Sequence, residues 1–307
     1  MRGVSVKRYL VFPLDFDSRA YFLKEPEENW DGKVKEIHLE NQKTLKERIK
    51  AEFGELNFDQ KLENFMGAGD APFSIISYHN QLYKQARSAF ICGLYYPALT
   101  ALCALGERII NHLIIDLREK YKYTKYYKYV YRNKSFDDWS YAINILVEWG
   151  VFQHQDVEKE FHKLKDIRMR SLHFNPDTYK NLRSDALSAL THLGNIISMQ
   201  FGFASNQKWI IHGTQGAFFI KKEAEQHPFM ARYYLPQCPL VGPYYAAHHT
   251  ERGQWLFFDW NNYDEREITD EEFSSLYTNR TLGQLVPNVI PFESNVSVQT
   301  SVVSLNS

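Results

Sequence analysis

A run of helical periodicity in the middle of the chain most limits what this sequence can fold into. Between residues 72 and 203, apolar residues recur three and four positions apart, the spacing of one helix face. The clearest face carries Leu99, Leu102, Leu105, Ile109 and Leu113. No single helix of this type can cover its own apolar stripe, so the pattern predicts several helices packed into one bundle.

Capping and breaking residues divide this region into five expected helices. Gly93 ends the first, Tyr96-Pro97 starts the second, Asp137-Asp138 caps the third, and Asn175-Pro176 separates the last two. The expected spans are Ser77 to about Cys92, Pro97 to beyond Leu113, Ser135 to Trp149, about Asp156 to Leu172, and a final helix ending at Phe201.

The two flanks have other patterns. The first flank holds a candidate strand, Arg8–Pro13, and a charged amphipathic helix, Gly32 to Phe53. After Gly202, strands are expected at Trp209–Ile211, Ala217–Ile220, Leu240–Ala247 and Trp255–Trp260, followed by a short helix that a capping box opens at Thr269.

We therefore predict an α+β chain with an N-terminal strand and helix segment at 1–71, a helical domain at 72–203, a β-rich region at 204–286 and a loosely ordered tail at 287–307. Strands from both ends could share one β layer.

Composition excludes some classes of function. The formal net charge of −1 gives no global attraction to nucleic acid or to an anionic membrane, so a polyanion site must be local. Three scattered cysteines favour neither a disulfide framework nor a zinc site, and we expect no metal and no cofactor. The N-terminus lacks the long apolar stretch of a secretory signal, which indicates a cytoplasmic protein. Residues 89–106 carry no formal charge, but Gly93 and Pro97 interrupt them, which favours core helices over a membrane span.

One short motif carries candidate chemistry. The stretch 165–174 reads KDIRMRSLHF, with Arg168 and His173 five residues apart. It resembles the R-x4–6-H signature of the HEPN superfamily. The resemblance includes the preceding helical pair, with Gly93, Tyr95 and Glu107, and covers about 130 residues. Met169 departs from the family pattern, because active members commonly place a polar residue, often Asn, after the arginine.

The resemblance implies a metal-independent endoribonuclease that leaves a 2′,3′-cyclic phosphate. Arg168 would bind the phosphate, His173 would transfer protons, Arg170 would add a phosphate contact, and Glu107 would orient the motif arginine. Glu107 could instead pair with Arg108 or Arg87. The family further implies RNA as substrate, a toxin or anti-phage role, an antitoxin or regulatory partner, and a homodimer with a composite cleft. Positions 168 and 173 lie about 140° apart around a regular helix, so a pocket that uses both needs long side chains, an irregular helix end or a second copy of the helix. The last option matches the family.

A basic, tyrosine-rich segment follows the second expected helix, at 117–134. Its candidate RNA contacts are Lys120, Lys122, Lys125, Tyr126, Tyr127, Lys128 and Arg132. Lysines can follow phosphates while tyrosine rings stack on bases. The alternative is that the tyrosines pack inward and the lysines stay in water.

Three functions remain open from the sequence. The leading hypothesis is the ribonuclease. Met169 favours the first alternative, a non-catalytic HEPN-like module that binds RNA or a protein. The third is an assembly protein whose aromatic C-terminal region is the functional part.

Overall fold

The computed structural model describes residues 6–12, 16–172, 178–202, 207–251, 254–261, 263, 266–286 and 298–304. The chain divides into two compact units. Asp15–Gly202 forms the helical unit, and Met1–Leu14 together with Phe203–Ser307 forms the split unit. Helices and strands both occur, so the α+β class is confirmed. The boundary near residue 203 was predicted, whereas the separate N-terminal segment at 1–71 divides between the two units.

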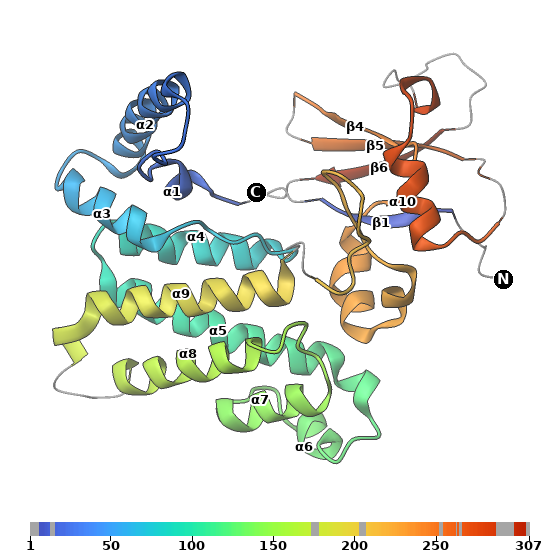
Figure 1. Ribbon diagram of the computed structural model, residues 1–307. Coiled ribbons are helices and arrows are strands. Elements are labelled where there is room, and N and C mark those ends of the chain that lie inside the picture. The colour runs from blue at the N-terminus through green and yellow to red at the C-terminus, as the bar shows by residue number, and fades with distance from the viewer. Residues whose placement is uncertain are drawn as a thin grey trace. The chain divides into compact units, whose positions relative to one another are not determined.

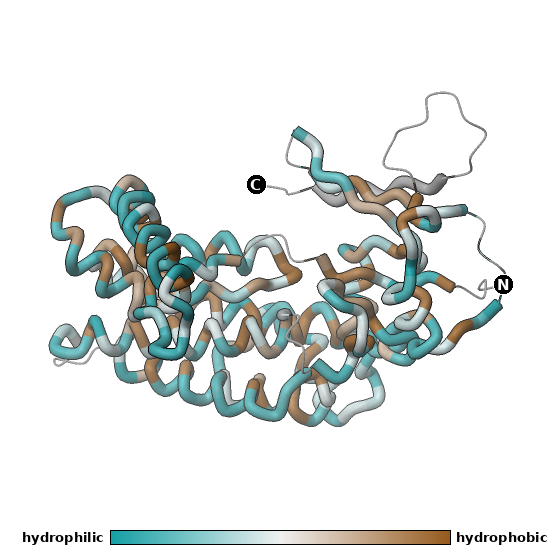
Figure 2. Tube along the Cα trace, turned by 45° about the horizontal axis from the view of Figure 1, so that its top comes forward, coloured by the Kyte–Doolittle hydropathy of each residue, from teal (hydrophilic) through white to brown (hydrophobic). Residues whose placement is uncertain are grey.

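The helical unit opens with α1 (Arg19–Phe22), α2 (Gly32–Phe53) and α3 (Phe58–Ala68). The Asp31 side chain caps α2 by accepting from the backbone N–H of Lys33, and Gly54, with φ of 82°, ends it as predicted. Most of α2 is hydrophilic (Figure 2), and its apolar side packs on a small core around Ile49 and Phe65. Helix α3 was not predicted.

Five helices form the bundle: α4 (Ser77–Ile91), α5 (Tyr95–Leu117), α7 (Trp139–Glu148), α8 (Val157–Leu172) and α9 (Leu182–Phe201). Helix α5 is central and contacts each of the other four (Figure 1). Its predicted face is buried, with Leu99, Leu102, Ile109 and Leu113 each 0% exposed. The first four helices match the predicted spans to within a few residues, because periodicity and caps indicate the same bounds. The last ends at Phe201 as predicted but begins at Leu182, later than the predicted cap at Asn175-Pro176.

A glycine allows close packing between helices of this bundle. A Cβ atom on Gly106 of α5 would lie 2.7 Å from Leu164 Cδ2 and 2.9 Å from a ring carbon of Trp139. Real Cβ atoms do not approach other atoms so closely. Gly106 thus lets α7 and α8 rest directly on α5.

Short elements join the bundle helices. They are η1 (Arg118–Tyr121) and α6 (Tyr127–Arg132) between α5 and α7, and η2 (Thr178–Asn181) before α9. Among the described residues, the stretch Tyr95–Tyr121 is long and apolar enough to cross a membrane, with 56% of its apolar window buried. The core helix of a soluble protein passes the same test, so this is weak support for a span.

The split unit contains strands from both ends of the chain. Strand β1 (Arg8–Val11) pairs antiparallel with β2 (Phe218–Phe219) on one side and β3 (Leu240–Val241) on the other, with Leu10 opposite Phe219. Strands from the two ends of the chain therefore do form one β layer, an arrangement that the sequence left open. The expected strand at Trp209–Ile211 is reduced to one bridge between Ile210 and Ile220.

A second sheet has the order β4 (Ala246–His249), β5 (Gln254–Trp260) and β6 (Val298–Ser304), all antiparallel. The expected strand Leu240–Ala247 is divided into β3 and β4 around Gly242-Pro243. Strand β6 falls in the tail that was expected to be loose.

Helix α10 (Asp270–Thr278) covers the core of the split unit. Thr269 caps it as predicted, accepting from the N–H of Glu272. Its Phe273 and Tyr277 pack with Leu10 and Phe219. The remaining turns are η3 (Lys222–Gln226), η4 (Met230–Tyr234), η5 (Leu235–Gln237) and η6 (Leu282–Gln284).

Candidate functional site

The motif arginine is held in place by two neighbouring helices. The guanidinium of Arg168, on α8, pairs with the Glu107 carboxylate of α5 at 2.9 Å and lies over the ring of Trp139 of α7, 5.5 Å from its centre. The indole N–H of Trp139 donates to the same carboxylate oxygen at 3.4 Å. Of the alternatives for Glu107, contact with the motif arginine is the one that the structure contains, whereas Arg87 pairs with Asp17.

A groove of about 480 Å³, here called the Arg168 hollow, lies beside this contact. Residues of α5 from Thr100 to Ile115, the loop residues Lys134 and Ser135, and Arg168 line it. The side chain at position 104 is only an alanine, which leaves space over the middle of α5. The hollow therefore combines an open floor with charged walls.

The charges of the hollow favour an anion. Arg108, Lys134 and Arg168 carry three positive charges against the one negative charge of Glu107. Guanidinium groups suit phosphate because their N–H groups form a planar fork. This local excess exists although the chain as a whole has a net charge of −1.

A histidine that the sequence analysis did not select also lines the hollow. His112 Nδ1 is 3.0 Å from the hydroxyl of Tyr78 on α4, and the two rings are 5.4 Å apart. Burial, and then the charge of Asp116, raise the pKa of Tyr78 to about 12, so its hydroxyl keeps its proton at neutral pH. In the sequence, His112 could have been linked to the site only by its spacing from Arg108, four residues earlier on the same helix. That spacing did not reveal its hydrogen-bond partner Tyr78.

The other motif residues have different places. Arg170 lies on another side of α8, where it pairs with Asp185 of α9 at 2.6 Å, and it does not line the Arg168 hollow. Ser171 donates to the second oxygen of Asp185. Met169 is 51% exposed. His173 lies outside the described residues.

The basic segment is only partly available to a polyanion. Lys122 pairs with Glu119 and Lys125 with Glu148, each at 2.8 Å. Tyr126 packs against Tyr141. Tyr127 packs against Tyr131. Within the part of the chain that the structure describes, no partner is found for Lys120, Lys128 and Arg132, and none of the three lines the Arg168 hollow.

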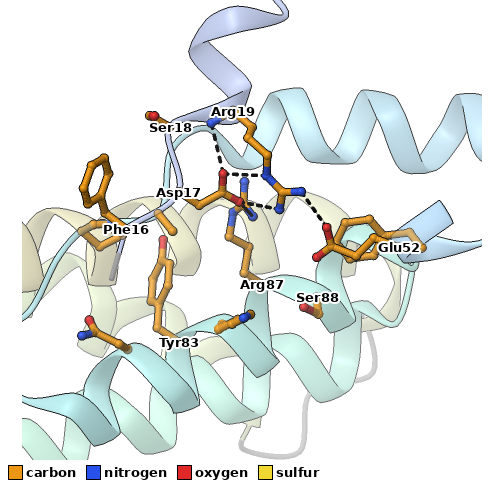
Figure 3. A pocket seen from close by; sticks show the side chains of 13 residues that line it. Phe16, Asp17, Ser18, Arg19, Glu52, Tyr83, Arg87 and Ser88 are labelled. Carbon is orange, nitrogen blue, oxygen red and sulfur yellow. Dashed lines mark hydrogen bonds and ion pairs between the residues drawn. The ribbon is translucent and has the colours of Figure 1, made fainter. Parts of the chain in front are cut away.

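A second recess, of about 520 Å³, lies between the segment 16–19, α2 and α4 (Figure 3). Asp17 accepts hydrogen bonds from Arg19 at 2.9 Å and from Arg87 at 3.0 Å, and Arg19 also pairs with Glu52 at 2.6 Å. The hydrogen bonds and positive charge of these partners lower the pKa of Asp17, although its burial alone would raise it.

These ion pairs hold the start of the helical unit onto α4. Two carboxylates balance two of the three cations that line this recess, the third being Lys84, so the recess has less attraction for a polyanion than the Arg168 hollow.

No group of three or more His, Cys, Asp or Glu side chains suited to a metal ion occurs among the described residues. Comparison with known proteins finds no matching family model, no matching curated protein and no matching solved structure.

Proposed function

We propose that this chain is a metal-independent endoribonuclease of the HEPN type and that the Arg168 hollow binds the RNA phosphate. The observation that carries the proposal is the fixed guanidinium of Arg168. Glu107 and Trp139 hold it at the edge of a groove that contains two further cations. Such prior orientation matters because a group that is already aimed at developing charge needs no reorganisation during the reaction.

Arg168 would stabilise the extra negative charge on phosphorus when the ribose 2′-hydroxyl attacks. His173, the motif partner, would help to transfer protons, from the same chain or from a second copy. The proposal therefore includes a cytoplasmic homodimer, with RNA as substrate and a toxin or anti-phage role under the control of an antitoxin or other regulatory partner.

The first alternative is an RNA-binding or protein-binding HEPN-like module without catalysis. Met169 favours it, because an exposed apolar side chain stands where active members commonly carry a polar one. This module would use the same hollow, so binding alone does not distinguish the two functions.

The test is cleavage of a mixed RNA pool in EDTA by the wild type, Arg168→Ala and Arg48→Ala. Arg48 is an exposed arginine of α2 and serves as the matched control. We expect 2′,3′-cyclic phosphate ends from the wild type and from the control, and a loss of about 10²–10³-fold in Arg168→Ala. An inert wild type at high concentration would refute the ribonuclease. Retained RNA binding that Arg168→Ala weakens would then support the alternative.

A further inference from the structure

The Arg168 hollow has two sides with different chemistry. Successive residues of α5 turn by about 100°, so Ala104, Asn111 and Ile115 fall within about 40° of one another and form the floor. On the same scale Glu107 and His112 lie about 140° apart, on opposite sides of that floor. Glu107 forms its ion pair with Arg168 on one side of the floor. His112 therefore stands across the hollow from the arginine.

Tyr78 fixes the ring of His112 by one nitrogen only. The hydroxyl lies 3.0 Å from Nδ1, and within the described part of the chain nothing is bonded to Nε2. A hydroxyl can donate to a bare Nδ1 or accept from an Nδ1–H. The hydrogen bond to Tyr78 therefore survives when the ring gains or loses a proton at Nε2.

Several charged and titratable groups surround this histidine. Arg108 and Asp116 lie one turn before and one turn after it on α5, and Lys134 lies on the hollow wall. From α4, besides Tyr78, His79 is near, but burial and then the charge of His112 lower the pKa of His79 to about 3, so His79 stays neutral. Arg168 and Glu107 pair with each other. Among these groups His112 is thus the imidazole that lines the hollow.

We propose that His112 accepts the 2′-hydroxyl proton of an RNA strand held in the Arg168 hollow, and that Tyr78 is its positioning residue. The proposal rests on the proposed ribonuclease function. In this step the 2′-oxygen forms a bond to phosphorus and its proton passes to Nε2 of His112. The bond from phosphorus to the 5′-oxygen breaks, and that oxygen takes a proton from water. The products are a 2′,3′-cyclic phosphate and a 5′-hydroxyl end.

The first experiment measures contact without catalysis. The full chain, labelled with ¹⁵N-histidine, is titrated with a 2′-O-methyl oligonucleotide, which has no 2′-hydroxyl and cannot be cleaved. Binding is followed by fluorescence anisotropy and the ring by NMR, with the His112 signals assigned from the variant His112→Gln. We expect the His112 signals to shift on binding, whereas those of His162, which lies outside the hollow on α8, stay in place. Unmoved His112 signals at saturation would overturn the proposal.

The second experiment measures cleavage by wild type, His112→Gln and His162→Gln. We expect His112→Gln to bind the oligonucleotide with an affinity within about threefold of wild type. It should cleave RNA at least about 10²-fold more slowly, the usual loss when acid–base catalysis is removed. His162→Gln should match the wild type. Wild-type cleavage by His112→Gln would overturn the role of His112 and leave the ribonuclease intact. An inert wild type would overturn the ribonuclease and, with it, this proton transfer.

Tyr78→Phe tests the positioning role. Loss of the hydroxyl should move the ¹⁵N shift of His112 Nδ1 and displace the pH profile of the cleavage rate, with circular dichroism unchanged. An unchanged pH profile would show that Tyr78 has only a packing role.

Discussion

Glu160 gives the sharpest test of how the bundle is held together, because it is a carboxylate that is only 6% exposed. It lies on α8 and joins that helix to α9. His192 Nδ1 is 2.8 Å from one oxygen and Asn195 Nδ2 donates to the same oxygen at 3.0 Å, while Lys163 donates to the other at 2.7 Å. Burial alone would raise the pKa of Glu160, but these three contacts outweigh it and lower the pKa from 4.5 to about 2.

The contribution of Glu160 to the free energy of unfolding follows from the difference between its pKa values in the folded and the unfolded protein. A carboxylate with a lower pKa in the folded protein stabilises the fold above its unfolded pKa, and the contribution disappears as the pH falls through the folded pKa. A fall from 4.5 to about 2 corresponds to about 3 kcal/mol at pH 7. At pH 3 only about 1 kcal/mol should remain.

The assay is urea unfolding at pH 7 and pH 3, followed by circular dichroism at 222 nm, for wild type, Glu160→Gln and Glu158→Gln. Glu158 is the control, because its side chain on α8 is 43% exposed and its carboxylate lies 3.9 Å from His162 Nε2. Glu160→Gln should be less stable than wild type by about 3 kcal/mol at pH 7 and by about 1 kcal/mol at pH 3. An equal difference at the two pH values would refute the reasoning, because packing and not charge would then explain it.

Three further perturbations test other parts of the helical unit. Gly106→Ala should lower the free energy of unfolding by about 1–3 kcal/mol, measured as a lower Tm, because the added methyl group overpacks against Trp139. The control Gly32→Ala should not lower the Tm, because a Cβ there meets nothing within 4 Å. Asp17→Asn should cost about 3 kcal/mol, because Arg87 is only 5% exposed and would lose its carboxylate; unchanged resistance of residues 16–23 to a protease would contradict this. Burial lowers the pKa of His79 to about 3, so at that position the unfolded chain binds a proton below about pH 6.5 while the folded chain does not. The free energy of unfolding should therefore decrease from pH 7 to pH 5, and His79→Phe should remove about 2 kcal/mol of that decrease, measured by urea unfolding.

The sequence predicts those parts of the fold that local patterns determine. Helix α2 has the bounds expected from its periodicity and from Gly54, and α10 begins at the expected cap. Strand β6 was missed because its pairing with β5 joins segments about forty residues apart, and a short run of Val, Thr and Ser does not reveal its partner.

The candidate site was predicted only in part, because it too depends on contacts between residues far apart in the sequence. Arg168 and Glu107 were both selected, but only the packing of α8 on α5 brings them to 2.9 Å. His112 was missed, because its hydrogen-bond partner Tyr78 is 34 positions away on another helix. Arg170 was grouped with the site by its nearness in sequence, although the helix turns it toward Asp185.

The pairing of β1 with β2 and β3 has a consequence for synthesis on the ribosome. Residue 11 is made more than two hundred residues before residue 241, and at about 5–20 residues per second this interval is on the order of tens of seconds. The whole helical unit, Asp15–Gly202, can emerge and fold during that time. Meanwhile the nascent strand has unpaired backbone groups on both edges, which invite pairing with other chains. Until residue 241 has been made, β1 therefore lacks a partner on at least one edge, and this interval is when the chain should be most vulnerable to aggregation.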